Sequence, residues 1–305
     1  MGRFGVKDAI AELTRHRVID VERVRQVPLR EHGVDGCDVV ALDRGAGPEL
    51  VVKIDQPGAL AAVARFHATY ADLPLVATPR WIDPASRFIA YDWVAGELGR
   101  GLEPAPDKTA TLLAIVDGLL AHYVPAPADP PGRLHAPWLP AAGRSSWQHL
   151  LGRMMAGRRD QVHGQLPASA GSLVRSLASA PHRRGEGPLH LMHGDCGAHN
   201  LVFRDGGLVA VIDPAPMVGE PIFELAFAFA SWPADLTLDA IVPAADALER
   251  SGRWQPPAGA RRRVLIEEVL LALYSRTGTF VVNRPADVPA YVAAFTYWTD
   301  LLARA

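Results

Sequence analysis

The chain has 305 residues, of which 49% are hydrophobic and 21% charged, and its formal net charge at pH 7 is −2. This length is sufficient for one large domain or for two moderate lobes with hydrophobic cores. The nearly balanced charge gives no general attraction to nucleic acid or to an anionic membrane, so we expect a small-molecule partner. Only two cysteines are present, Cys37 and Cys196, and no apolar run reaches membrane-spanning length. We therefore expect a cytoplasmic location.

The first part of the chain has the pattern of a short helix followed by an antiparallel sheet. Apolar residues at helical spacing predict helices over residues 7–17 and 58–70. Short Val-rich runs bounded by Gly and charged turns predict strands over residues 21–29, 38–43, 50–54, 78–82 and 88–91.

Two features of this sheet indicate phosphate binding, and each has a competing explanation. Lys53 is one of only three lysines in the chain and lies inside the predicted strand 50–54. It is either a phosphate-binding group or a solvent-facing strand residue. Gly33 and Gly36 lie in the turn after the first strand, where backbone amides are free to approach phosphate oxygens, although a plain β-turn explains them equally well.

From residue 98 onward the pattern is mainly helical. The predicted helices cover residues 107–123, 145–161, 168–180, 222–232, 235–250, 258–276 and 287–303. Between the third and fourth of these lies an exception, the stretch 189–217, with several short apolar runs.

This stretch reads LHLMHGDCGAHNLVFRDGGLVAVIDPAPM and gathers four polar groups. A short apolar strand ends at His193 and Asp195. Two further apolar runs flank Asp205-Gly206-Gly207, which predicts a β-hairpin with a tight turn. The hairpin returns Asp213 to the neighbourhood of Asn200. Two carboxylates and an amide brought together in this way predict a site for Mg²⁺ and a hydroxyl group.

The spacing His193-Gly194-Asp195-x-x-x-x-Asn200 resembles the catalytic loop of protein kinases, with Gly in place of Arg, and Ile212-Asp213-Pro214 stands where they carry Asp-Phe-Gly. With the Gly variant, the stretch is similar to the aminoglycoside phosphotransferase family. The continuation through Gly219-Glu220-Pro221 resembles the streptomycin-type antibiotic kinases of that family.

The resemblance implies an α+β, bilobal, protein-kinase-like fold. Its small antiparallel β-sheet N-lobe would cover residues 1–96, with a hinge at about 91–97, and its mainly helical C-lobe would cover residues 97–305. It also implies an enzyme that moves the γ-phosphoryl group of ATP or GTP, with Mg²⁺, to a hydroxyl of an aminoglycoside or related cationic antibiotic. Such an enzyme would serve antibiotic resistance or self-protection.

The family's site residues map onto the matching positions of this chain. Asp195 would be the catalytic base, Asn200 and Asp213 the metal ligands, and His193 a supporting residue behind them. Lys53 would bind the non-transferred phosphates. The backbone of Asp92 and Val94 would meet the nucleobase edge, unless the segment 91–97 is a bare exposed turn. Gly33 and Gly36 would cover the phosphates.

The chain departs from the family pattern in its acidic residues. The predicted helix 58–70 lacks the Glu that orients the strand lysine, so a carboxylate from elsewhere, such as Glu12, would have to replace it. Glu220 and Glu224 stand where the family often has Asp, and we expect both to cap backbone amides. Carboxylates that could hold a cationic antibiotic are Glu267, Glu268 and Asp300, although each also fits an exposed helical charge.

Two other function classes and one competing metal interpretation remain open. A metabolite kinase of the same fold, acting on a choline-, sugar- or homoserine-like alcohol, would differ only in its pocket. The missing helix Glu would also fit a nucleotide-binding regulatory pseudokinase. Finally, His193, Cys196 and His199 have a spacing that three zinc ligands could adopt, but the sequence offers no paired fourth ligand.

Overall fold

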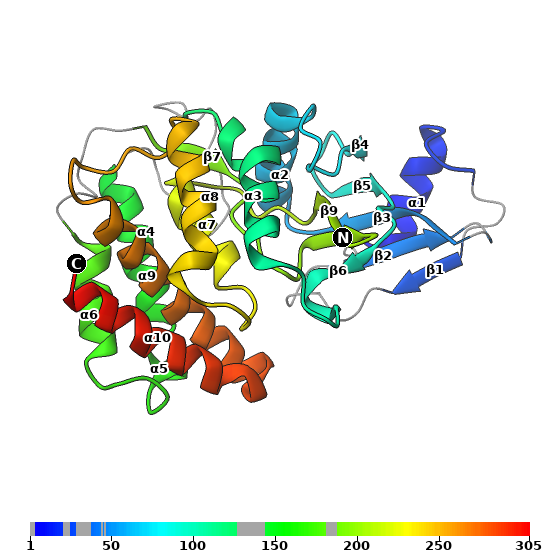
Figure 1. Cartoon of the computed structure of the whole chain (residues 1–305). Coiled ribbons are helices and arrows are strands. Elements are labelled where there is room, and N and C mark those ends of the chain that lie inside the picture. Colours follow the sequence, from blue (N-terminus) through cyan, green and yellow to red (C-terminus); the bar gives the residue numbers. More distant parts are fainter. Residues whose placement is uncertain are drawn as a thin grey trace.

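The computed structural model describes residues 4–20, 25–28, 38–43, 45, 47–126, 144–180 and 188–305. Figure 1 shows a sheet-rich part formed by the first hundred residues and a helical part formed by most of the rest. Gly33 and Gly36 lie outside the described residues, so the phosphate-covering loop stays a prediction.

The sheet-rich part contains a five-stranded antiparallel sheet with the order β1-β2-β3-β5-β4. Its strands are β1 (Arg25–Pro28), β2 (Asp38–Asp43), β3 (Pro48–Ile54), β4 (Pro79–Ile82) and β5 (Phe88–Asp92). Lys53 lies on the central strand β3, opposite Val39 of β2 and Ile89 of β5.

A helix packs on each face of this sheet. Because strand side chains alternate, Val52 and Ile54 of β3 face α1 (Val6–Arg15) and share a buried cluster with its Leu13. On the other face, α2 (Pro57–Tyr70) buries Leu60 against Ile89 of β5. Lys53 therefore belongs to the face opposite α1.

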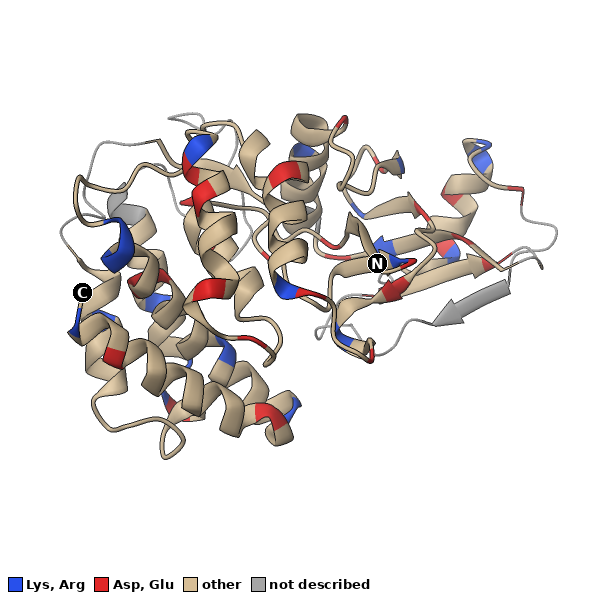
Figure 2. Ribbon diagram, in the orientation of Figure 1, with Lys and Arg blue, Asp and Glu red and all other residues tan. Residues whose placement is uncertain are grey.

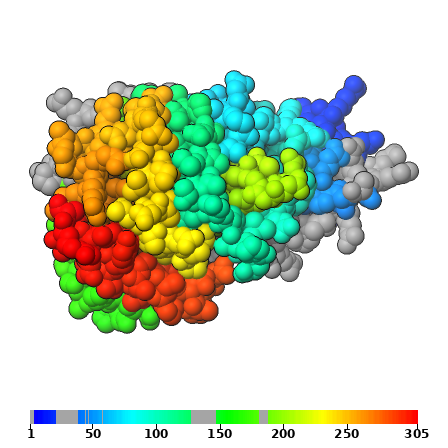
Figure 3. All heavy atoms as spheres, viewed as in Figure 1, coloured from blue at the N-terminus to red at the C-terminus, as the bar shows by residue number. Residues whose placement is uncertain are grey.

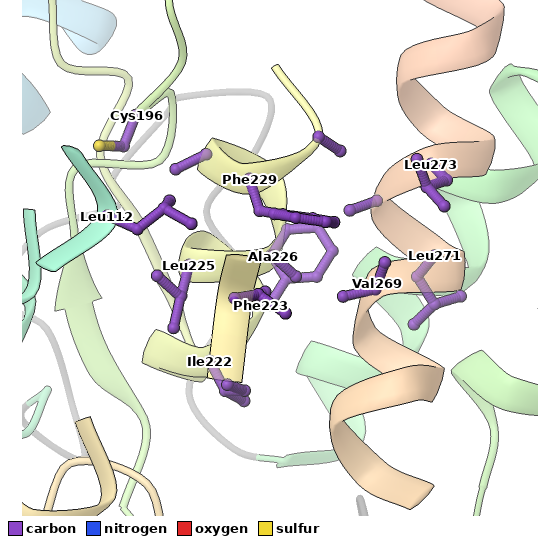
Figure 4. Close-up of a cluster of buried hydrophobic side chains, with 14 of the residues drawn as sticks. Leu112, Cys196, Ile222, Phe223, Leu225, Ala226, Phe229, Val269, Leu271 and Leu273 are labelled. Atoms are coloured by element: carbon purple, nitrogen blue, oxygen red, sulfur yellow. The ribbon is translucent and has the colours of Figure 1, made fainter. Parts of the chain in front are cut away.

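The helical part is built around one long buried core. Its helices are α3 (Lys108–Gly118), α4 (Arg144–Gly157), α5 (Arg159–Val162), α6 (Ala170–Ala178), α7 (Pro221–Phe229), α8 (Leu238–Arg250), α9 (Arg261–Asn283) and α10 (Val288–Ala303). The helix α7 contacts α3, α8 and α9 and buries every residue except Phe227. In Figure 4 its side chains lie between Leu112 of α3 on one side and Val269 of α9 on the other.

Two small sheets place the polar stretch between the two parts. The strand β7 (His190–Met192) pairs with β10 (Met217–Gly219), and β6 (Glu97–Leu98) pairs with the hairpin of β8 (Leu201–Arg204) and β9 (Gly207–Val211). The hairpin was predicted, and Asp205 and Gly206 form its turn with φ of 52° and 77°. Figure 3 shows its surface between the blue sheet-rich end and the yellow-to-red helical end.

Charge is distributed evenly over the described chain. Figure 2 shows basic and acidic residues interspersed along both parts. Within the described residues, none of the helices combines the length and the apolar character that crossing a membrane requires.

Candidate active site

A cavity of about 540 Å³ lies between the sheet and the β8–β9 hairpin. Its lining is largely apolar, with residues such as Val51, Val202 and Val211. Five of the predicted site residues also line it, namely Lys53, Asp92, Val94, Asn200 and Asp213. Residues more than 140 positions apart in the sequence are thus brought to one cavity.

Lys53 forms an ion pair with Asp213, with 2.5 Å between Nζ and Oδ1. The Lys53 side chain is 15% exposed and that of Asp213 is 41% exposed. The suggestion that Glu12 replaces the missing helix Glu is wrong, because Glu12 pairs with Arg87 and Arg15 at 3.3 and 2.9 Å. The pair places a cation and a carboxylate side by side at the end of the cavity.

The helix α2 presents a histidine near Lys53. His67 is buried, and its Nε2 lies 3.1 Å from the hydroxyl oxygen of Tyr91. Burial lowers the pKa of His67 to about 4, and the neighbouring His193 and Lys53 act in the same direction. The ring is therefore neutral at pH 7, which avoids a second positive charge beside Lys53.

The segment after β5 borders the cavity, and its role as a hinge stays a prediction. The Trp93 amide donates to the Glu49 carbonyl at 2.8 Å, so the chain still pairs with β3 at this residue. Asp92 and Val94 both line the cavity, whereas the Asp92 side chain is 56% exposed and pairs with Arg80.

His193 holds the loop that carries Asp195 in place through hydrogen bonds. It is completely buried, its Nε2 lies 3.1 Å from the Ile212 carbonyl oxygen, and its Nδ1 accepts the Asp195 amide at 3.3 Å. Burial lowers its pKa to about 4, although the charges of Asp195 and Asp213 oppose this shift. These partners require the neutral tautomer with hydrogen on Nε2, so His193 acts by holding the loop against the strand end before Asp213.

Close contact between two backbone segments explains why glycine occupies position 194. Gly194 has a φ of +81°, and a Cβ built on it would lie 2.0 Å from the Ala215 carbonyl oxygen. The Ala215 amide donates to the His193 carbonyl at 2.9 Å, which holds the two segments together. A side chain at position 194 would push them apart.

Asp195 is hydrogen-bonded through one carboxylate oxygen. Its Oδ2 lies 2.9 Å from Nε2 of His199 and accepts Nδ2 of Asn200 at 3.0 Å. Burial opposes a low pKa, but the hydrogen bond and charge of His199 and the charge of Arg276 hold the pKa of Asp195 below its usual value. The i+4 spacing of His199 from Asp195 allows this contact, although the sequence pattern had indicated His199 only as a possible metal ligand.

Buried polar groups support the loop from α7. Glu224 accepts the Gly194 amide at 2.6 Å and the Tyr123 hydroxyl at 2.7 Å. The Ser231 hydroxyl oxygen accepts the Ala198 amide at 2.9 Å. Glu224 does cap a backbone amide, as predicted, but it caps the loop rather than its own helix. Burial raises its pKa to about 7 against the lowering effect of these hydrogen bonds.

The zinc interpretation has no support in the described part of the chain. No group of three His, Cys, Asp or Glu side chains there could hold a metal ion. Both ring nitrogens of His193 already have hydrogen-bond partners, and Cys196 is buried.

The acidic residues proposed for a cationic substrate are not gathered at Asp195. Glu267 and Glu268 are 3% and 0% exposed inside α9, and Glu267 pairs with Arg263 at 3.0 Å. Asp300 lies on the exposed side of α10. Only Asp300 is therefore an exposed helical charge, and the other two belong to the interior.

The sequence matches the phosphotransferase enzyme family over residues 31–263, and the chain belongs to this family. A search of curated protein sequences returned no match. The family match confirms the predicted relationship to aminoglycoside phosphotransferases, and the protein is a phosphotransferase.

Solved structures confirm the protein-kinase-like fold. A macrolide 2'-phosphotransferase from Brachybacterium faecium has a TM-score of 0.58 at 19% identity, over 94% of this chain and 97% of that one. Choline kinase from Cryptosporidium parvum has a TM-score of 0.60 at 10% identity, over 97% and 95% of the two chains. A ternary complex of streptomycin and ATP with APH(2'')-IIa has a TM-score of 0.54 at 14% identity, over 97% and 99%.

Proposed function

We propose that this phosphotransferase moves the γ-phosphoryl group of ATP or GTP to a hydroxyl group of a small molecule in the cytoplasm. The observation that carries the proposal is the meeting of Lys53, Asn200 and Asp213 at one end of an apolar cavity, directly beside Asp195. In this proposal residues 1–96 form the nucleotide lobe and residues 97–305 the catalytic and substrate lobe. The ATP in the streptomycin complex of the related fold supports a nucleotide co-substrate.

The nucleotide would occupy the cavity with its phosphates toward Lys53. The apolar lining suits a nucleobase, whose polar edge would meet the peptide groups of Asp92 and Val94. Lys53 would bind the phosphates that are not transferred. Its present partner, Asp213, would then be released to bind a metal ion instead.

The donor set at this end of the cavity fits Mg²⁺. The Asn200 amide nitrogen donates to Asp195, which leaves its carbonyl oxygen Oδ1 available, and Asp213 contributes a carboxylate. Mg²⁺ prefers oxygen ligands and is often held by one or two carboxylates together with substrate phosphates. When bound, the ion would neutralise charge on the phosphate oxygens.

Asp195 would act as the base through its other oxygen. Because Oδ2 is already held by His199 and Asn200, Oδ1 is the atom left to accept the proton of the acceptor hydroxyl. The low pKa of Asp195 keeps the carboxylate ionised at neutral pH. Orientation of the hydroxyl toward the γ-phosphate would be its main contribution.

An aminoglycoside or related cationic antibiotic is our first candidate acceptor, which would make the enzyme a resistance or self-protection factor. The family and the macrolide and streptomycin enzymes of the same fold support this candidate. A metabolite kinase is the second candidate. It is favoured because two of the three proposed cation-binding carboxylates, Glu267 and Glu268, are buried in α9.

A coupled assay of ADP or GDP release over a panel of antibiotics and metabolite alcohols tests the proposal. We expect acceptor-dependent release with wild type and a loss of about 10²–10⁴-fold in turnover with Asp195→Asn, the range for removal of a general base. Circular dichroism and nucleotide titration should be unchanged in the variant. Near-normal turnover by Asp195→Asn would remove Asp195 as the base. Inhibitory concentrations in an expressing host separate the two acceptor candidates.

A further inference from the structure

One buried guanidinium near Asp195 has no hydrogen-bond partner. Arg276 lies on α9 and is 5% exposed, and its Nε and Nη2 atoms donate to no acceptor in the described part of the chain. Its guanidinium lies over the Phe227 ring, 3.6 Å from the ring centroid. Stacking on an aromatic face holds the planar group in place but satisfies none of its N–H donors.

The catalytic loop passes directly over this guanidinium. A Cβ built on Gly197 would lie 2.3 Å from Nη2 of Arg276 and 2.9 Å from Cε1 of His199. Gly197 is two residues from Asp195, and its missing side chain lets the loop backbone approach the guanidinium closely. Arg276 and Asp195 are near enough for each charge to stabilise the other.

A second arginine packs against the same helix, two residues from Arg276. Arg158, at the junction of α4 and α5, is partly buried, and the charges of Arg158 and Arg276 repel each other. The Arg158 stem packs on Gly278, where a Cβ would lie 3.0 Å from its Cδ. Its Nη1 donates to Gln161 at 3.0 Å, which is a neutral partner. Within the described residues, neither guanidinium is hydrogen-bonded to a carboxylate.

Such an arrangement is unfavourable in the absence of an anion. A buried, unpaired charge loses its hydration without compensation, and a second like charge adds repulsion. Asp195, the carboxylate whose charge acts on Arg276, already accepts hydrogen bonds from His199 and Asn200 and would be needed for the acceptor hydroxyl. Guanidinium groups match the planar or tetrahedral oxygens of carboxylates and phosphates.

We propose that Arg276, with Arg158 beside it, binds an oxyanion of the acceptor, so that the substrate is a hydroxyl compound carrying a carboxylate or phosphate group. This inference rests on the proposed role of Asp195 and narrows the acceptor class. The same two guanidiniums disfavour a polycation at this position, because they repel its positive charges. Among the candidate acceptors, it selects anionic metabolites over cationic antibiotics.

The first test compares acceptors and variants. Wild type, Arg276→Gln and Arg262→Gln are assayed with MgATP on hydroxy carboxylates, phosphorylated alcohols, and neutral or cationic hydroxyl compounds. Arg262 is exposed on the same helix and controls for the loss of one charge. We expect anionic acceptors to be preferred, and Arg276→Gln to raise their KM about 10- to 100-fold, the effect of a lost charge-assisted hydrogen bond.

The hydroxy carboxylates and the phosphorylated alcohols of the panel show whether the bound oxyanion is a carboxylate or a phosphate. A preference for cationic acceptors that is unchanged in Arg276→Gln would overturn the oxyanion site and leave the phosphotransferase proposal intact. If wild type phosphorylates nothing in the panel, the function proposal fails, and the oxyanion site is decided by binding alone.

The second test measures that binding. Thermal unfolding of the three proteins is followed in sodium sulfate and in sodium chloride at equal ionic strength, with ADP and Mg²⁺ present to fill the cavity. Sulfate stabilises proteins in general, and this contribution should be equal in all three. We expect an additional rise in Tm in wild type and Arg262→Gln that is absent in Arg276→Gln. In chloride, Arg276→Gln should be at least as stable as wild type, since it removes an unpaired buried charge. Equal sulfate effects in all three proteins would overturn the site.

Discussion

The cavity and the underside of the catalytic loop use polar residues in opposite ways. At the cavity, Lys53 and Asp213 are partly exposed and form an ion pair with each other that a ligand is able to replace. Beneath the loop, His193 and Glu224 are 0% and 2% exposed and are hydrogen-bonded to backbone groups. The first set is arranged to exchange partners, and the second set is arranged to keep them.

This difference separates ligand binding from stability. A change at the cavity should weaken binding and leave the fold intact, because the exposed pair contributes little to folding. A change beneath the loop should lower the free energy of unfolding, because a buried polar group loses its partner or its space. Variants on the two sides therefore test whether the division holds.

The largest effect is expected for Asp213→Ala. Removing the carboxylate removes one of the two protein ligands proposed for Mg²⁺, so Mg²⁺-dependent nucleotide binding should weaken by about 100-fold or more, as for loss of a charge-assisted contact. Isothermal titration calorimetry with ATP, with and without Mg²⁺, measures the change. Asp205→Asn, in the hairpin turn, is the matched control and should bind normally. Unchanged Mg²⁺-dependent binding by Asp213→Ala would exclude Asp213 as a metal ligand.

The second effect concerns the close backbone contact at Gly194. Gly194→Ala should lower the free energy of unfolding by about 2–4 kcal/mol, because its Cβ meets a backbone carbonyl that cannot move aside cheaply. Gly252 has a similar φ of +75° but no atom within 4 Å of its Cβ position. Gly252→Ala should therefore cost only about 1 kcal/mol of backbone strain. Urea denaturation compares the two, and equal losses would show that the contact with Ala215 is unimportant.

The difference between the cavity and the underside of the catalytic loop also explains which site residues the sequence could predict. Lys53, the hairpin and Asp213 are carried by local patterns, and the structure brings them together at the cavity. The strands β6 and β10 were missed because two or three residues carry no periodicity of their own. The hydrogen bond of Tyr123, the proximity of Arg276 and the cap that Glu224 places on the loop rather than on its own helix were missed, because segments far apart in the chain supply them. Burial of a charged residue depends on tertiary packing that spacing does not encode.

The smallest expected effect is that of Glu224 on the free energy of unfolding. It is also the most specific one, because it depends on pH. Burial raises the pKa of Glu224 to about 7, so between its usual value of 4.5 and about 7 the folded protein binds more protons than the unfolded chain. Stability from this group therefore falls as pH rises through that window and is constant above it. In Glu224→Gln this dependence is lost.

The measurement is the free energy of unfolding of wild type and Glu224→Gln between pH 4.5 and 8. The wild-type value relative to the variant should fall by on the order of 2 kcal/mol across this range. The control is Glu97→Gln, which removes an exposed carboxylate on β6. Its curve should run parallel to that of wild type. If the Glu224→Gln curve is also parallel, the carboxylate beneath the loop titrates as an exposed one does, and the distinction between exchangeable and permanent partners fails at this residue.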